Sequence, residues 1–227
     1  MRRCFPLWLV SLAFGLTLSL GTFAQQPPAG KVAAAAPTSG PRAEFLTELK
    51  VEEDKFIRLA EATPADKYTW RPAPDVRSIG EVYLHVAAAN YNLPHLIGTD
   101  PPAGFKAQGF DKSTTDKAKI IEILNDSFAH TRQAVIKMPD ADLEKQLDWF
   151  GGKNTERGIL LFMIRHMAEH LGQSIAYARM VGVVPPWTED AQKAKKAETK
   201  PQAIAATGNG PILVRPGSCR RLYWLSL

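Results

Sequence analysis

Two histidines stand four residues apart in Arg165-His166-Met167-Ala168-Glu169-His170-Leu171, within a long segment whose apolar residues recur at helical spacing. That separation places both side chains on one face of an α-helix, about one turn apart. Two imidazoles in this arrangement can hold a metal ion, but a stable site needs at least one further protein ligand. His85 stands in a second segment with helical periodicity and is the candidate for that ligand. The sequence thus predicts a metal-binding helical protein more clearly than it predicts a reaction.

Four segments show the apolar periodicity of amphipathic helices, and they cover about residues 42–62, 78–93, 115–137 and 156–181. The second segment begins at Ser78, and Glu81 stands three residues later as its capping-box partner. No stretch between them alternates convincingly as a β-strand. Four long helices with short or medium connections predict an all-α fold, a four-helix bundle. Bundle cores are places where facing helices build metal sites.

The first 24 residues have the features of a secretory signal peptide. Arg2 and Arg3 precede an apolar stretch over residues 7–20, and Thr22-Phe23-Ala24 supplies a cleavage site before Gln25. A retained membrane anchor is the competing interpretation, but the apolar stretch is shorter than the ~20 residues that span a bilayer. We therefore expect an exported protein, periplasmic or extracellular, with no membrane contact after cleavage.

The regions that flank the predicted bundle are poor in large apolar residues. Residues 25–41 form a Pro/Ala/Gly-rich stretch and predict a flexible linker, which leaves residues 42–187 as the folded domain. Residues 188–227 predict a disordered tail. The Ala/Lys run at 191–197 also permits a short solvated helix, although it offers no apolar stripe for docking.

Charge and cysteine content exclude two classes of protein. The formal net charge is +5, and removal of Arg2 and Arg3 with the signal leaves +3, spread without a basic stripe. Nucleic acid is therefore not an expected partner. Cleavage also leaves Cys219 as the only cysteine, so an internal disulfide is impossible and stability must come from core burial.

Two groups of motifs resemble a known family. Tyr68-Thr69-Trp70-Arg71-Pro72 precedes Ser78-Ile79-Gly80-Glu81-Val82-Tyr83-Leu84-His85, and Gly172-Gln173 and Tyr177-Ala178-Arg179 follow the paired histidines. This arrangement, over about residues 45–186, resembles the DinB-like superfamily of metal-binding helical bundles, which is distinct from the DNA polymerase of that name. The resemblance implies a four-helix bundle with a three-histidine metal site, which maps onto His85, His166 and His170.

The family resemblance leaves the reaction open. Three histidines on a divalent ion, zinc or nickel, leave a coordination position for water or substrate, as catalytic sites require. The leading hypothesis is an exported metal-dependent transferase or hydrolase acting on a small molecule. The alternative is a non-catalytic protein in which the metal is structural or is itself the cargo. Relatives include thiol-dependent enzymes and often pair through helices, so a homodimer is plausible.

Other residues around the histidines allow competing interpretations. His166-x-x-Glu169-His170 also matches the inverted zincin pattern, in which the glutamate is a general base, but those peptidases take a third ligand far downstream. We expect Glu169 to face solvent or to support a neighbouring helix. His95 and His130 have the settings of surface histidines. The candidates for the walls of the site are Trp70, Tyr83, Asn90, Trp149, Phe150 and Tyr177, and Gly151-Gly152 suggests a mobile loop beside it.

Overall fold

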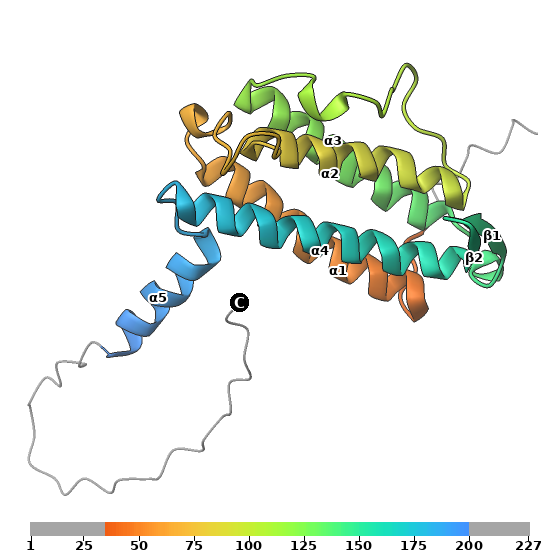
Figure 1. The fold of residues 1–227 in the computed structure, drawn as a ribbon. Coiled ribbons are helices and arrows are strands. Elements are labelled where there is room, and N and C mark those ends of the chain that lie inside the picture. The colour runs from red at the N-terminus through yellow and green to blue at the C-terminus, as the bar shows by residue number, and fades with distance from the viewer. Residues whose placement is uncertain (1–34, 200–227) are drawn as a thin grey trace, which may run out of the picture. The chain divides into compact units, whose positions relative to one another are not determined.

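The computed structural model describes residues 35–199, and most of these are helical (Figure 1). The described α-helices are α1 (Gly40–Ala62), α2 (Ile79–Asn92), α3 (Lys117–Lys137), α4 (Glu156–Met180) and α5 (Pro186–Thr199). Short 3₁₀ turns occupy Ala65–Lys67, Leu93–Ile97, Phe110–Lys112 and Asp140–Asp142. The predicted signal peptide, its competing anchor helix, most of the predicted linker and residues 200–227 lie outside the described residues. Within residues 35–199, no helix combines the length and the hydropathy needed to cross a bilayer.

Helices α1 to α4 form the predicted bundle, in which α1 packs on α3 and α4, and α2 packs on the same two helices (Figure 1). Their ends lie within two residues of the predicted ones, and α1 begins at Gly40 rather than Arg42. The predicted capping box at the start of α2 is present, since the Ser78 hydroxyl accepts from the Glu81 amide and the Glu81 carboxylate accepts from the Ser78 amide. Asp116 caps α3 by accepting from the Lys119 amide, and Thr155 caps α4 by accepting from the Gly158 amide.

The core lies where the apolar faces of the four helices meet. Its largest fully buried side chains come from all four helices and from the α1–α2 connection, and they include Phe56, Tyr68, Tyr83, Phe128 and Met163. Gly80 permits close packing in the first turn of α2, because a Cβ there would lie 3.0 Å from Cδ1 of Ile120. This packing sets the position of α2 along the bundle, and therefore the height of His85.

A β-hairpin corrects the expectation of a fold without strands. Strands β1 (Gln146–Trp149) and β2 (Gly152–Thr155) pair antiparallel, with Trp149 opposite Gly152. The two-residue turn has positive φ at both Phe150 (44°) and Gly151 (79°), which is the type I′ geometry that matches the twist of a hairpin. The sequence hides this turn because Phe replaces the usual Asn, Asp or Gly at its first position. The Gly151-Gly152 segment, predicted as a mobile loop, thus belongs to the turn and second strand of a hairpin immediately before α4.

Helix α5 corrects the prediction that a disordered tail begins at residue 188. Residues 186–199 are helical, and α5 contacts α1. Trp187 packs partly buried against the core, and Asp190 forms an ion pair with Arg58 of α1. The alternative prediction of a short solvated helix at 191–197 is therefore nearer to the structure than the disordered tail. Alanine and lysine favour the helix, and Trp187 anchors its first turn.

Candidate metal centre

The structure brings the three predicted histidines together between α2 and α4. His85 comes from α2, His166 and His170 come from successive turns of α4, and all three side chains are partly buried. One nitrogen from each ring can be chosen so that all lie within 4.8 Å of one another. Among the described residues this cluster contains no carboxylate or thiol. It is a neutral, all-nitrogen donor set of the kind that zinc and nickel accept.

The distance between two of the rings fits coordination of a common ion. Nε2 of His85 lies 3.2 Å from Nε2 of His166. Two nitrogens bound tetrahedrally to zinc at ordinary bond lengths stand roughly 3.3 Å apart. The same distance also suits a hydrogen bond between two imidazoles, so the case for a metal depends on the third ring.

The third ring is held in the orientation of a metal ligand. Nδ1 of His170 lies 2.8 Å from Oε1 of Gln173, one turn further along α4. Since an amide oxygen only accepts, Nδ1 carries a proton, and in the neutral ring the lone pair is then on Nε2. The amide nitrogen of Gln173 donates in turn to the Tyr177 hydroxyl at 2.9 Å. Metal-bound histidines typically have such a partner on the nitrogen that does not bind the metal.

Burial keeps two of the imidazoles neutral. The pKa of His85 is lowered to about 4, first by burial and then by the charges of Arg77 and His170, while Asp111 acts in the opposite direction. The pKa of His166 is also lowered to about 4, first by burial and then by the neighbouring rings and Arg165. Both rings therefore have a free lone pair at neutral pH, which metal binding requires.

Aromatic side chains form one end of the site. The Phe162 ring stacks on His166 with a centroid distance of 6.1 Å and an interplanar angle of 27°. Trp149 contacts Phe162 at 4.8 Å, and Phe150 at the hairpin turn contacts Trp149 at 4.5 Å. The hairpin thus places Trp149 against Phe162 beside the cluster, whereas Phe150 is exposed and contacts Trp149 rather than a histidine, so no contact supports its assignment to a wall. Phe162 was not among the predicted wall residues, yet its ring contacts a histidine of the cluster.

The other predicted wall residues have different roles. Tyr177 supports the site through Gln173, and its ring packs edge-on against Trp70 at 5.6 Å. Tyr83 is fully buried among Phe56 and other core rings, so its assignment to a wall is wrong. Asn90 is also buried, and it donates to the Ser127 hydroxyl between α2 and α3. Both residues point to the core because their positions on α2 face away from His85.

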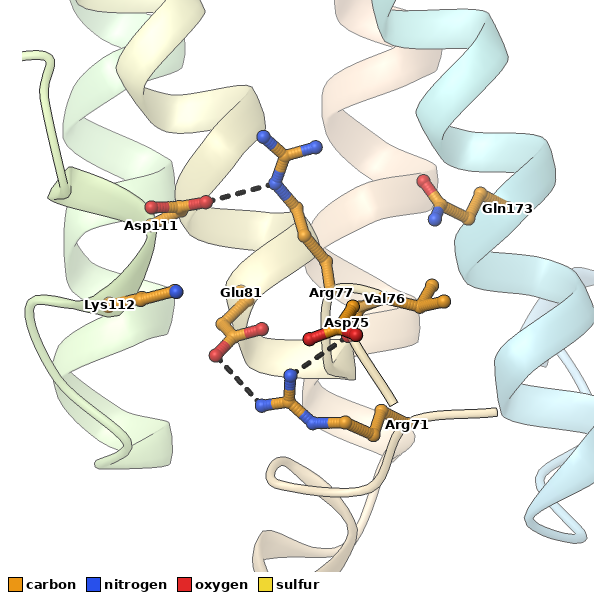
Figure 2. Close-up of a pocket in the computed structure, with 8 residues that line it drawn as sticks. All are labelled: Arg71, Asp75, Val76, Arg77, Glu81, Asp111, Lys112 and Gln173. Atoms are coloured by element: carbon orange, nitrogen blue, oxygen red, sulfur yellow. Dashed lines mark hydrogen bonds and ion pairs between the residues drawn. The ribbon is translucent and has the colours of Figure 1, made fainter. Parts of the chain in front are cut away.

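A polar pocket of about 500 Å³ opens at the other end of the site (Figure 2). Gln173 belongs both to this pocket and to the histidine cluster. The other lining residues are Arg71, Asp75, Val76, Arg77, Glu81, Asp111 and Lys112. The sequence motifs included Arg71 and Glu81, but Arg77 and Asp111 were missed because their proximity depends on how the α2–α3 connection folds back.

Comparison with known proteins identifies the family. The sequence pattern of the DinB superfamily matches residues 48–174, more than half of the chain. The chain belongs to the DinB superfamily. The chain is 23% identical to the uncharacterized protein YjoA of Bacillus subtilis (strain 168) over 142 residues. The aligned region covers 61% of this chain and 86% of YjoA.

Solved DinB-like structures share the fold. A DinB-like protein from Bacillus cereus ATCC 10987 has a TM-score of 0.56 at 20% identity, over 63% of this chain and 93% of that protein. The YjoA structure has a TM-score of 0.50 at 21% identity, over 62% and 93% of the respective chains. At these identities the likeness concerns the bundle and does not extend to an activity.

The remaining candidates lie outside the cluster of this DinB superfamily protein. Glu169 is exposed and faces Arg165 at 3.6 Å on the outer side of α4, as expected, so it is not placed as a general base beside the histidines. His95 is exposed, as expected, and contacts Asp100 at 2.8 Å. His130 is partly buried against Tyr91 and its Nε2 has no hydrogen-bond partner among the described residues, which corrects its assignment to the surface. Burial lowers the pKa of His130.

Proposed function

We propose that His85, His166 and His170 bind one divalent metal ion, zinc or nickel, and that the protein is a metal-dependent transferase or hydrolase acting on a small molecule. The observation that carries the proposal is the meeting of three half-buried imidazoles, two with lowered pKa and the third oriented by Gln173. Three protein ligands leave a coordination position open, which distinguishes catalytic from closed structural sites.

A divalent ion at this position supplies a Lewis acid that can stabilise a thiolate, polarise a carbonyl or lower the pKa of water. The chain's own residues supply the surroundings. Gln173 holds the proton of His170 on Nδ1, Phe162 covers one face of His166, and the polar pocket begins at Gln173. The site therefore lies between an apolar and a charged environment, as a site for a small organic substrate requires.

The location of the site favours catalysis over a structural role for the metal. The helices that carry the histidines also bury core residues such as Val82, Val86, Met163 and Met167. Because this packing already joins α2 and α4 to the bundle, we expect the fold to survive without the ion. A structural metal would instead make folding depend on loading.

Metal analysis of the purified protein and of single histidine variants tests this proposal. We expect one ion per chain, and we expect His85→Ala, His166→Ala and His170→Ala each to lower that content. His95→Ala is the matched control, because this exposed histidine lies in the 3₁₀ turn Leu93–Ile97 and outside the cluster. Unchanged metal content in all three cluster variants would refute the proposal.

A further proposal concerns the location of the protein in the cell. We propose export to the periplasm or the outside of the cell, on the basis of the composition of residues 1–24. Formation of a homodimer stays a prediction from the family resemblance. N-terminal sequencing of the protein recovered from cells would test the proposed export. An intact Met1 would contradict it, whereas a start near Gln25 would support it.

A further inference from the structure

Arg77 and Gln173 connect the polar pocket to the histidine cluster. Arg77 lies in the α1–α2 connection, immediately before the cap of α2. It lines the pocket, and its charge contributes to the lowered pKa of both His85 and His166. Gln173 joins the same two features by a hydrogen bond. A molecule in the pocket would therefore lie against the residues that surround the proposed ion.

Most charges in the pocket are already paired. Arg71 donates to the Glu81 carboxylate at 2.9 Å and to the Val76 carbonyl, and Arg77 donates through Nε to Asp111 at 3.0 Å (Figure 2). These pairs leave Lys112 and Asp75 as further charges of opposite sign in the lining. The lining is thus formally balanced, and a divalent ion on three neutral imidazoles would make the combined site positive. Such a site favours an anion.

Arg77 has unused donors that can receive the anion. Only its Nε is engaged by a described residue, and its two terminal nitrogens point away from Arg71 and Glu81 (Figure 2). A guanidinium binds carboxylate and phosphate groups through such a pair of nitrogens. Asp111 orients the side chain from the 3₁₀ turn Phe110–Lys112, which Phe110 holds against Tyr91 of α2.

The aromatic side chains lie on the opposite side of the histidines. Along α4 the order is Phe162, His166, His170 and Gln173, so the ends of this row are eleven residues apart. At the rise of an α-helix this separation is about 16 Å. The side chains close much of this separation, because the Phe162 ring stacks on His166 and the Gln173 amide oxygen contacts His170. The row therefore has an apolar end at Phe162, the histidines in its middle, and at Gln173 the polar pocket that Arg77 also lines.

We propose that the substrate is a small amphiphilic anion. Its anionic group binds the terminal nitrogens of Arg77, its apolar group packs on Phe162 and Trp149, and its reacting atom lies between them at the histidines. This inference depends on the proposed metal function, and it adds the substrate class and the residue that selects it. Arg77 is the specificity-determining residue for the anionic group.

Three thiol probes separate the parts of the proposal. N-benzoylcysteine has a metal-binding sulfur, a carboxylate and a ring, whereas N-benzoylcysteamine lacks the carboxylate and N-acetylcysteine lacks the ring. Their dissociation constants are measured on the cobalt-loaded protein from the sulfur-to-cobalt absorption band. We expect N-benzoylcysteine to bind most tightly. We expect Arg77→Gln to weaken its binding about tenfold, as loss of a charged hydrogen bond does, with no change for N-benzoylcysteamine. Phe162→Leu should weaken both benzoyl probes about threefold and leave N-acetylcysteine unchanged.

Arg165→Gln is the matched control for charge. Its guanidinium also acts on the pKa of His166 and lies over the Phe162 ring at 5.0 Å, but it does not line the pocket. Any effect through Phe162 is shared by both benzoyl probes, so it cancels in the ratio of their affinities. The affinity ratio of N-benzoylcysteine to N-benzoylcysteamine should stay unchanged in this variant and fall in Arg77→Gln. An unchanged ratio in Arg77→Gln would overturn the proposal.

A second comparison keeps this test separate from that of the metal. N-benzoylalanine and N-ethylbenzamide differ in the same carboxylate but lack the thiol, and they are compared by calorimetry on the metal-free protein. Weaker binding of N-benzoylalanine to Arg77→Gln than to the unsubstituted protein supports the role of Arg77. Equal binding to both proteins contradicts it. Failure to bind any metal would refute the proposed function alone.

Discussion

Replacement of Gln173 by leucine should weaken metal binding without removing a ligand. The side chain keeps its approximate volume but loses the oxygen that accepts from Nδ1 of His170 at 2.8 Å. The imidazole can then adopt the other tautomer or rotate, so that Nε2 no longer presents its lone pair to the cluster. Leucine also leaves the Tyr177 hydroxyl without the donor that Gln173 provides.

The size of the effect follows from this hydrogen bond. A neutral hydrogen bond stabilises by about 1 kcal/mol net, and about 1.4 kcal/mol corresponds to a factor of ten in affinity. Residues that orient metal ligands typically change affinity about 10- to 100-fold when replaced. Because Gln173 is only partly buried, water can replace part of its contact, and we expect a loss near tenfold.

A competition titration of zinc against a chromophoric chelator measures this loss. Gln173→Glu retains an acceptor for Nδ1 and should recover most of the affinity. Asn125→Leu is the control for removal of an amide, because Asn125 is exposed on α3 and donates to the Ile121 carbonyl of the same helix. If Gln173→Leu keeps the original zinc affinity while His170→Ala loses it, Gln173 does not orient the ligand and the reasoning is refuted.

Three other predictions concern stability. In metal-free protein, folded-state pKa values of about 4 for His85 and His166 lie below the unfolded value of ~6.5, so the unfolded chain binds protons first as pH falls. The free energy of unfolding should therefore fall as the pH is lowered from ~6.5 to ~4, by about 2 kcal/mol after allowance for solvent screening. Chemical denaturation at several pH values should show a flatter dependence of the free energy of unfolding on pH in the double variant His85→Gln/His166→Gln. An unchanged dependence on pH would contradict this. Ser78→Ala should lower the free energy of unfolding by about 1 kcal/mol through loss of the α2 cap, and no change in urea denaturation would contradict it. Phe150→Asn should increase the free energy of unfolding by about 0.5 kcal/mol and so raise the melting temperature slightly, because Phe150 is 88% exposed and has a positive φ that asparagine adopts more easily. A lower melting temperature would contradict it.

The bundle and the histidine cluster could be predicted because each depends on local sequence patterns. Helical spacing determined which faces of α1 to α4 are buried, and the interval from His166 to His170 set two donors on one face. The prediction that His85 lies opposite these two histidines depended on the family resemblance, because periodicity alone does not give the position of one helix along another. Gly80, through its contact with Ile120 and Tyr68, is one of the residues that determine this height.

Other features depended on tertiary contacts that have little local signal. The hairpin has an unusual Phe at a positive φ, and the contacts of α5 include the packing of Trp187 and the ion pair of Asp190 with Arg58. Arg77 and Asp111 are 34 residues apart and meet because the α2–α3 connection folds back onto α2. His130 is partly buried, with its ring against Tyr91 of α2, a contact between two helices that periodicity does not predict.

A crystal structure of the zinc-loaded protein, with anomalous scattering measured above and below the zinc edge, tests the central claim most directly. The account predicts one anomalous peak bonded to nitrogens of His85, His166 and His170, each at about 2.0 to 2.1 Å. It also predicts that Oε1 of Gln173 remains hydrogen-bonded to His170. A fully occupied peak away from these three rings, or a zinc ion bound without His85, would contradict it.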